Sequence, residues 1–351
     1  MTAFISGWET LVFMKILHTS DWHLGQHFIT KSRASEHAAF MDWLLAQVVE
    51  KQIDAVIVAG DIFDTGTPPS YARELYNRFI VAMSKLPCQL VILAGNHDSV
   101  AMLNESKQLL QELHTQVITS VSDDLASQLI TLKSEAGEPQ ALLCAIPFVR
   151  PRDVMRSQAN QSGIEKQALL GDAIKQHYAD LHTLALSQQA DITAECGYQV
   201  PIIATGHLTA MGVSVTESVR DIYIGTLDGF AANQFPKADY IALGHIHRAQ
   251  KVAKSEHIRY SGSPIALSFD EAKQQKSVNL VHFDTGKLTA VEILPVPTFQ
   301  PMQLLKGNLT SLETQLQDFP NKTDLDNELV TWLCIEVEEQ DYLQDLQTRI
   351  A

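Results

Sequence analysis

Residues 55–64 read AVIVAGDIFD, an apolar run that ends at Gly60 and continues into two acidic side chains, Asp61 and Asp64. The run is typical of a short buried strand. A glycine directly after it lets the backbone turn sharply and approach a bound group closely. In α/β sheets, the loops at such strand ends converge on a common crevice. The stretch therefore predicts an α/β fold with a polar site at the ends of its strands.

Similar arrangements of an apolar strand followed by polar residues recur on both sides of this stretch. One such cluster is weak evidence, because Gly-Asp and Gly-His commonly make turns and a lone histidine at a strand end is more often structural. Five clusters in order, each after an apolar strand, indicate one shared site. The other four are Asp21-Trp-His23, Gly95-Asn96-His97-Asp98, Gly206-His207 and Gly244-His245-Ile-His247.

Apolar strands alternate with amphipathic helices through about residue 295. Helices are expected at 35–51, from the Pro68-Pro69 pair through Leu86, and at about 164–189. The early strands alternate with helices, which favours parallel pairing, whereas the later strands follow one another closely, which favours a mixed sheet. Two packed sheets covered by helices, an α-β-β-α sandwich, accommodate both patterns.

The composition shifts at the stretch VPTFQPM, where two prolines mark a boundary. We expect residues 14–295 to form one domain and residues 296–351 to form a small, partial α+β domain. The second domain reads as a strand, a helix at 309–317, the strand TWLCIEVEE, and a helix begun at Tyr342. The chain stops inside that last helix, which suggests truncation.

The bulk composition limits the class of protein. There are 41 acidic and 26 basic residues, a net charge of −15, whereas a stand-alone DNA-binding domain normally carries a basic footprint. The four cysteines are scattered without a CxxC pair, which argues against disulfides or a zinc finger and favours a reducing cytoplasm. No apolar run approaches the ~20 residues of a membrane helix. Residues 1–13 lack the features of a signal peptide, and we expect them to be a non-native extension before Met14.

The side chains of the five clusters suit divalent metal ions. Carboxylate and amide oxygens, together with imidazole nitrogens, bind Mn²⁺, Fe²⁺, Mg²⁺ or Zn²⁺, and no thiolate typical of structural zinc is among them. So many ligands exceed what one ion takes, which predicts two ions. Two ions ~3.5–4 Å apart need a carboxylate that bridges them.

The series DxH, GDxxD, GNHD, GH and GHxH resembles the calcineurin-like metallophosphoesterase superfamily. The stretches HTSDWHLGQ, LAGNHDS, YIALGHIHRAQ and RYSGSPIALSFDE are similar to the SbcD family of bacterial DNA-repair nucleases, and the resemblance runs from about residue 14 to the end. It implies that His97 is catalytic and that Asp64, which stands where relatives often carry a histidine, supports the site. The implied ligands are Asp21, His23, Asp61 and His247 for the first ion, and Asp61, Asn96, His207 and His245 for the second.

The resemblance also implies an activity and partners. The activity is ATP-dependent 3′-to-5′ exonuclease action on duplex DNA, with endonuclease action on single strands and hairpins. Mn²⁺ is expected ahead of Mg²⁺, Fe²⁺ or Zn²⁺, and hydroxide activated by two ions would attack phosphorus. The implied partners are an SbcC-type coiled-coil ATPase and a second copy of the chain, in the bacterial cytoplasm at the nucleoid. Residues 296–351 would begin the family's capping domain, without the segment that docks on the ATPase.

Two other functions stay open. The first is another phosphoesterase of this fold, such as a protein phosphatase or a cyclic-nucleotide phosphodiesterase. Protein phosphatases typically show GDxxDRG and GNHE, and this chain has GDIFDTG and GNHD, which disfavours them. A non-catalytic scaffold would be expected to lose a ligand or the catalytic histidine. Lys31, Arg33 and Arg248 are candidate DNA contacts, with a solvated loop or a local ion pair as the alternative for each. Trp22 is expected to pack inside the protein rather than to stack on a base. Because the chain is acidic, we expect its binding to duplex DNA to depend on a partner that supplies positive charge.

Overall fold

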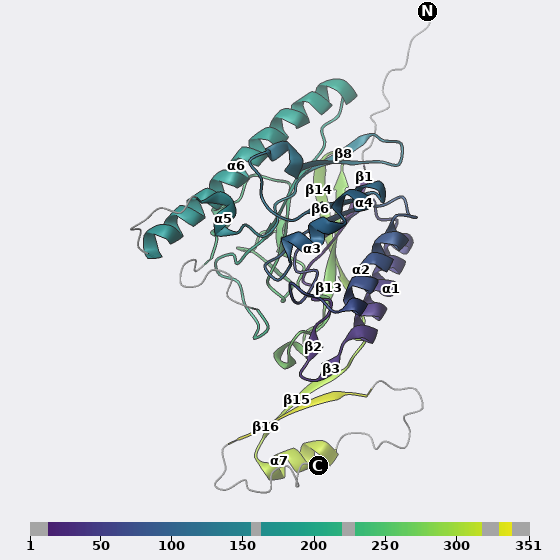
Figure 1. Ribbon diagram of the computed structural model, residues 1–351, viewed down its shortest axis with the longest axis vertical. Helices are drawn as coiled ribbons and strands as arrows, with labels where there is room; N and C mark the ends of the chain where they lie inside the picture. The colour runs from purple at the N-terminus through teal and green to yellow at the C-terminus, as the bar shows by residue number, and fades with distance from the viewer. Residues whose placement is uncertain (1–12, 156–162, 220–228, 318–329, 339–351) are drawn as a thin grey trace, which may run out of the picture.

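The computed structural model describes residues 13–155, 163–219, 229–317 and 330–338. Two six-stranded sheets lie face to face with helices on their outer sides (Figure 1). The first sheet has the order β14-β13-β1-β4-β5-β6 and the second β11-β12-β10-β9-β8-β7. The predicted α-β-β-α sandwich is therefore confirmed.

The first sheet is parallel from β1 through β6, and β13 and β14 extend it with antiparallel pairing. This is the predicted mixture, since the early strands are separated by helices and the late strands by short turns. Its strands are β1 (Phe13–Thr19), β4 (Ala55–Ala59), β5 (Gln89–Leu93), β6 (Thr115–Ile118), β13 (Ser277–Asp284) and β14 (Lys287–Pro295).

The second sheet is parallel over β8, β9, β10 and β12, with β7 and β11 antiparallel at its two edges. Its strands are β7 (Leu129–Lys133), β8 (Pro139–Cys144), β9 (Ile202–His207), β10 (Tyr240–Gly244), β11 (Gln250–Lys251) and β12 (Ile258–Tyr260).

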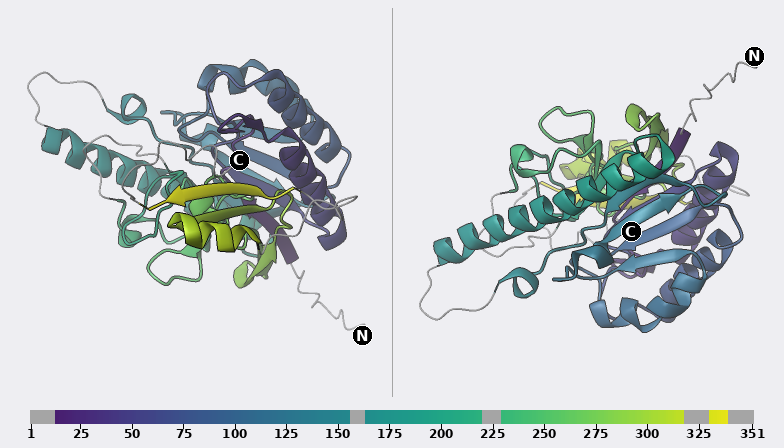
Figure 2. Two further views of the ribbon diagram at one scale, coloured as in Figure 1. Left: turned by 90° about the horizontal axis from the view of Figure 1, so that it is seen from below. Right: turned by 90° about the horizontal axis from the view of Figure 1, so that it is seen from above.

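Helices cover the outer faces of both sheets, and Figure 2 shows the long α6 on one side and α1 and α2 on the other. The helix α6 (Gly163–Cys196) runs past the predicted end at residue 189. In the described part of the chain, no helix combines the length and apolarity that a membrane span requires. The other helices are α1 (Ala34–Lys51), α2 (Ser70–Met83), α3 (Val100–Glu105), α4 (Lys107–Glu112), α5 (Pro151–Val154) and α7 (Leu309–Gln317).

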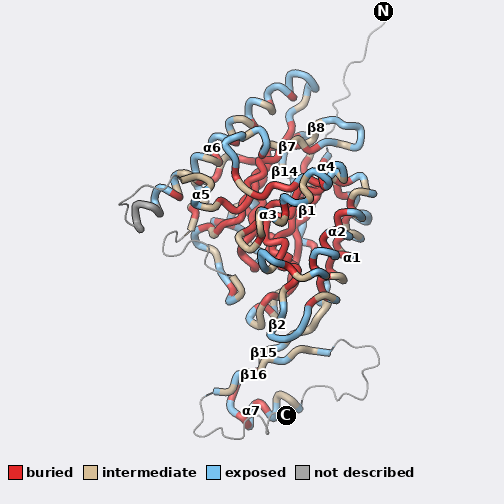
Figure 3. The backbone as a smooth tube through the Cα atoms, viewed as in Figure 1, coloured by how far each residue is buried: buried red, intermediate tan, exposed pale blue. Residues whose placement is uncertain are grey.

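Three apolar layers hold the sandwich together, and buried residues concentrate on the central strands (Figure 3). The layer between the sheets is rich in alanine, including Ala55, Ala59, Ala141 and Ala242. Such small side chains let the two sheets approach closely, because close packing leaves few voids between them. This close approach brings the strand ends of both sheets to one place.

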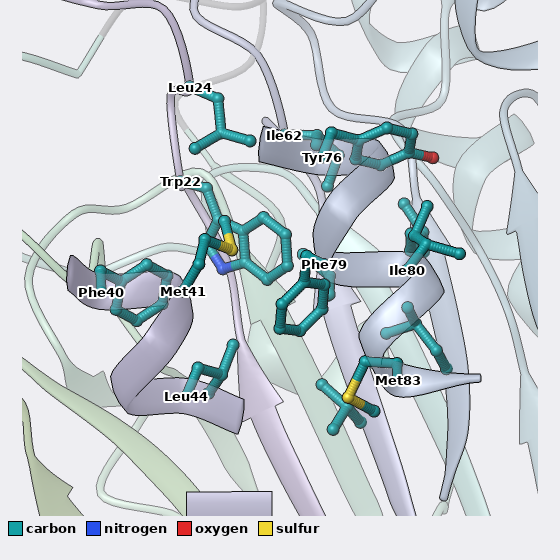
Figure 4. Close-up of a cluster of buried hydrophobic side chains, with 14 of the residues drawn as sticks. Trp22, Leu24, Phe40, Met41, Leu44, Ile62, Tyr76, Phe79, Ile80 and Met83 are labelled. Carbon is teal, nitrogen blue, oxygen red and sulfur yellow. The ribbon is translucent and has the colours of Figure 1, made fainter. Parts of the chain in front are cut away.

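Trp22 anchors the loop that follows β1. Its side chain is fully buried and packs edge-on against Phe40 of α1 and Phe79 of α2, at ring separations of 6.0 and 5.4 Å (Figure 4). Its indole Nε1 donates to Thr19 Oγ1 at 3.0 Å. The prediction that Trp22 packs inside the protein is confirmed, and its burial turns the flanking Asp21 and His23 the other way.

The C-terminal strands β15 (Met302–Gly307) and β16 (Trp332–Val337) pair in parallel beside α7. They lie beneath the short hairpin of β2 (His27–Phe28) and β3 (Lys31–Ser32) in Figure 1. Phe28 of this hairpin stacks on Trp332 at a ring separation of 5.8 Å. The helix predicted from Tyr342 and residues 1–12 of the predicted extension lie outside the described residues.

Candidate metal centre

Five loops from both sheets converge on one buried cluster that contains all seven predicted ligands and His97. The first sheet contributes the loops after β1, β4 and β5, and the second sheet contributes those at the ends of β9 and β10. Four of the predicted ligands adopt left-handed backbone conformations, which persist at functional sites only when the surroundings hold them in place. These are Asp21 (φ 55°), His23 (φ 46°), Asp61 (φ 51°) and His245 (φ 94°).

Glycines let these loops approach one another. A Cβ atom on Gly95 would lie 2.1 Å from Asp61 Oδ1, and a Cβ atom on Gly60 would lie 2.1 Å from His207 Nδ1. Gly60 also has a φ of +95°, which side chains disfavour. From the sequence we predicted that these glycines let the backbone approach a bound group closely. In the structure they also make room for neighbouring candidate ligand side chains.

Asp61 lies at the centre of the cluster. Its Oδ1 atom accepts a hydrogen bond from the His97 backbone N–H at 2.9 Å. Its Oδ2 atom lies 3.3 Å from His207 Nε2, 3.6 Å from His23 Nε2 and 4.0 Å from His97 Nε2. Burial alone would raise the pKa of Asp61, but these histidines, with His207 first, hold it well below its ordinary value.

The histidines are oriented through one ring nitrogen each. His207 Nδ1 lies 2.9 Å from the Ala59 carbonyl oxygen, and His247 Nδ1 lies 2.6 Å from Ser218 Oγ. His23 Nδ1 lies 3.2 Å from Asp64 Oδ1. Partners of this kind fix the ring and its tautomer in metal-binding histidines and leave the other nitrogen for the ion.

Two histidines of the cluster have pKa values shifted in opposite directions. Burial opposes protonation of His207, but Asp61 outweighs it and raises the pKa of His207 to about 9. Burial and the neighbouring His207 instead hold the pKa of His245 well below its ordinary value. Histidines shifted in opposite directions around one carboxylate compete for the same charge.

The donor set fits divalent metal ions. Among the described residues, three buried polar atoms of the cluster have no hydrogen-bond partner: Asp61 Oδ2, His23 Nε2 and His245 Nε2. Buried polar atoms are normally paired, and an unpaired one calls for an explanation such as an absent ion. Three sets of side chains bring their candidate ligand atoms within 4.8 Å of one another: Asp21–His23–His247, His23–Asp61–His97 and Asp61–His207–His245.

Asn96 and Asp64 complete the surroundings. Asn96 Oδ1 lies 2.9 Å from His207 Nε2 and 3.2 Å from His245 Nδ1. The Asp64 carbonyl oxygen lies 2.7 Å from His97 Nδ1, while its carboxylate contacts His23. The structure thus places Asn96 with the second predicted ligand group and Asp64 as a support for two histidines.

Two known families match most of the chain. Residues 14–249 match the family described as calcineurin-like phosphoesterase, and residues 298–351 match the family described as Type 5 capsule protein repressor C-terminal domain. The SbcD component of the SbcCD nuclease of Escherichia coli strain K12 is 54% identical over 341 residues, which cover 96% of this chain and 81% of that protein. The chain belongs to the SbcD family of calcineurin-like phosphoesterases.

Relatives of the same name occur in more distant bacteria. The SbcD protein of Rhodobacter capsulatus is 34% identical and covers 85% of this chain and 73% of its own length. That of Bacillus subtilis is also 34% identical and covers 78% of this chain and 67% of its own. The predicted family is confirmed, and with it the prediction of an enzyme that hydrolyses phosphodiester bonds.

One predicted DNA contact of this SbcD family member is wrong. The Arg33 side chain is only 1% exposed. Its Nε donates to Glu36 Oε2 at 2.8 Å and its terminal nitrogen donates to the Ala266 carbonyl at 2.6 Å. A guanidinium committed to buried partners cannot reach a phosphate. Lys31 and Arg248 are exposed, so both stay predictions.

Sequence reasoning missed several residues that support this SbcD-type site. Asp98 accepts the backbone N–H groups of Ile62, Phe63 and Gly95 at 2.8–3.1 Å, joining two of the ligand loops. Its position in the GNHD motif was the available signal. Arg150 donates to the carbonyl oxygens of Gly95 and Asp98 across more than fifty residues, and no local pattern indicates such a contact.

Proposed function

We propose that this chain is the catalytic subunit of a two-metal DNA nuclease. With an SbcC-type ATPase it would act as an ATP-dependent 3′-to-5′ exonuclease on duplex DNA. On single strands and hairpins it would act as an endonuclease, in DNA repair, recombination and replication. The observation that carries the proposal is the buried Asp61 carboxylate, whose Oδ2 atom lacks a hydrogen-bond partner among the described residues while three histidine Nε2 atoms surround it within 4.0 Å.

The proposed ligand assignment follows the two groups around Asp61, which would bridge the ions. Mn²⁺ is the proposed ion, since oxygen and imidazole donors suit it. Ions held by these residues would supply Lewis acidity, the chemistry that makes a water molecule nucleophilic near neutral pH. The first ion is assigned to Asp21, His23, Asp61 and His247, and the second to Asp61, Asn96, His207 and His245.

His97 is the proposed acid of the reaction. Its Nδ1 atom is engaged by the Asp64 carbonyl at 2.7 Å, so Nδ1 carries a proton whatever the charge of the ring. A proton added at Nε2 is then available to a phosphoryl oxygen or to the departing 3′ oxygen. Asp64 supports this role through its backbone and supports His23 through its carboxylate.

The proposed partners account for the acidic charge of the chain. A net charge of −15 opposes binding to duplex DNA. We therefore propose that the ATPase and a second copy of the chain contribute to DNA binding. Lys31 and Arg248, both exposed, would add local contacts. We place the protein in the bacterial cytoplasm, at the nucleoid. Residues 14–295 would form the nuclease domain and residues 296–351 the capping domain.

The test is cleavage of end-labelled single-stranded and hairpin DNA by this chain with Mn²⁺, with Mg²⁺ or with EDTA. We expect cleavage with Mn²⁺ that EDTA abolishes. If the chain hydrolyses bis(p-nitrophenyl) phosphate with Mn²⁺ but cuts neither DNA, the metal centre stands and the DNA substrate is wrong. Inactivity on every substrate would contradict the enzyme assignment of this chain.

A further inference from the structure

A buried ion pair between Glu271 and Lys276 lies beside His247. Neither residue is among those proposed above to bind or support the ions. Both side chains are buried, at 0% and 9% exposure. Lys276 Nζ donates to Glu271 Oε2 at 2.6 Å and to the His247 carbonyl oxygen at 3.0 Å. Burying two charges is costly unless further hydrogen bonds satisfy them. A pair kept at this position calls for a role at the site.

Glu271 is surrounded by donors. Its Oε2 atom accepts from Lys276 and from the Leu267 backbone N–H at 3.0 Å. Its Oε1 atom accepts from Thr216 Oγ1 at 2.8 Å and from Ser218 Oγ in a shorter contact. The hydroxyls of Ser263 and Ser268 add longer contacts at 3.4 and 3.3 Å. A carboxylate that faces a cation and five other donors is ionised and can only accept hydrogen bonds.

This surrounding fixes the direction of the next hydrogen bond. Ser218 has a single hydroxyl hydrogen, and Glu271 takes it. The Ser218 oxygen therefore has to accept from His247 Nδ1, which lies 2.6 Å away. His247 is held with its proton on Nδ1 and with the lone pair of its neutral ring on Nε2, the nitrogen a metal ion takes when Nδ1 is hydrogen-bonded.

We propose that Ser218 and Glu271 are positioning residues that select the Nδ1-protonated tautomer of His247. We call the chain of hydrogen bonds from His247 through Ser218 to Glu271 the relay. Lys276 fixes the direction of its hydrogen bonds, because it holds Glu271 ionised and also donates to the His247 carbonyl oxygen. The inference rests on the proposed function, because the selected tautomer matters only if His247 binds an ion. It adds that Thr216 and Ser218, which lie after β9, belong to the surroundings of the first metal site.

The test compares Ser218→Ala with Thr216→Val, which removes another hydroxyl from Glu271 Oε1 but leaves the bond between Ser218 and His247. Long-range ¹H–¹⁵N spectra of histidine-labelled, metal-free protein at pH 8 report the tautomer, with His247 assigned by His247→Gln. We expect the Nδ1–H form in the wild type and in Thr216→Val, and a shift toward the Nε2–H form in Ser218→Ala. A Ser218→Ala spectrum with the Nδ1–H form unchanged overturns the relay.

Calorimetric Mn²⁺ binding gives the second readout. Ser218→Ala should weaken one of two binding events by roughly tenfold or more, as for other partners of metal-binding histidines, and Thr216→Val should stay within about threefold of the wild type. Equal Mn²⁺ affinity in Ser218→Ala and the wild type overturns the positioning role. If the wild type binds no Mn²⁺, the proposed function fails, and the spectra still decide the relay. Melting curves of each variant verify folding.

Discussion

The backbone N–H of His97 donates to Asp61 Oδ1 at 2.9 Å, while His97 Nε2 lies 4.0 Å from Asp61 Oδ2. One oxygen of the central carboxylate is thus oriented by the main chain of the residue whose side chain stands beside the other oxygen. The imidazole itself is held from behind by the Asp64 carbonyl. The backbone of His97 therefore orients Asp61, whereas the His97 ring is left for chemistry.

The first prediction follows from that separation. His97→Ala keeps the backbone N–H that orients Asp61, so Mn²⁺ binding should stay within about threefold of the wild type. Loss of a general acid should lower the rate of hairpin cleavage by about 10²–10⁴-fold. Single-turnover cleavage and Mn²⁺ calorimetry measure the two effects. His182→Ala, at a half-buried histidine on α6 that lies outside the cluster, is the control; a large loss of Mn²⁺ binding in His97→Ala would make His97 a ligand instead.

Asp64→Ala should weaken Mn²⁺ binding more than it impairs the chemical step. The substitution removes the carboxylate at His23 Nδ1 but keeps the carbonyl at His97. We expect Mn²⁺ affinity to fall by about 10–100-fold, and high Mn²⁺ to restore most of the cleavage rate. Titrating the cleavage rate against Mn²⁺ measures this. A rate that stays low at saturating Mn²⁺ would place the Asp64 carboxylate in the chemical step.

The sequence could predict which side chains gather in the cluster because their positions are local. Each stands directly after an apolar strand, and a strand end fixes where its side chain emerges. The burial of Trp22 was also predictable, because an aromatic side chain between two polar residues of a site is expected to point into the apolar core. The fold followed from the order of strands and helices for the same reason.

Contacts between distant segments could not be predicted in this way. Arg33 lies near the first motif in sequence, but its carbonyl partner at Ala266 is 233 residues away. Glu271 contacts Ser218 across 53 residues and Arg150 contacts Gly95 across 55. These pairings depend on how the two sheets face each other, which the pattern of one segment does not contain.

The corrected position of Arg33 gives a prediction about stability. Arg33→Ala would leave Glu36 buried without its cation, where burial raises the pKa of Glu36. We expect the free energy of unfolding to fall by about 3 kcal/mol. Lys31→Ala, at an exposed position two residues before Arg33, should change it by less than about 0.5 kcal/mol. Urea unfolding compares the two; equal stabilities would contradict the buried ion pair.

Arg150 should matter far more than its neighbour Arg152. Arg150 donates to the carbonyl oxygens of Gly95, Asp98 and Thr119 and so closes the loop that carries Asn96 and His97. Arg150→Ala should cost about 1–3 kcal/mol of stability, because three carbonyl groups lose a charged donor, and should lower cleavage. Arg152, with its side chain 75% exposed, is the matched control. Thermal melts and cleavage rates of both variants decide the point.

The last prediction concerns acid stability and His18, which is fully buried between the sheets. His18 Nδ1 lies 2.9 Å from Tyr240 Oη on the opposite sheet, and its Nε2 lies 3.2 Å from the Leu243 carbonyl oxygen. Burial lowers the pKa of His18 from 6.5 to about 3, so the folded protein holds it neutral. The unfolded chain binds a proton on His18 below pH 6.5 and the folded protein does not, so acid favours unfolding.

The stability that depends on neutral His18 is therefore fully present above pH 6.5 and is lost progressively as the pH falls toward 3. At pH 5 the loss from this one group is about 2 kcal/mol relative to neutral pH. His18→Gln keeps a hydrogen-bonding side chain but cannot titrate, so its unfolding free energy should fall less between pH 7 and pH 5 by about that amount. The buried His37 has a similarly lowered pKa, and both proteins retain its contribution, so the difference isolates His18. Parallel slopes for the two proteins would mean that His18 is protonated in the fold, against its burial between two sheets.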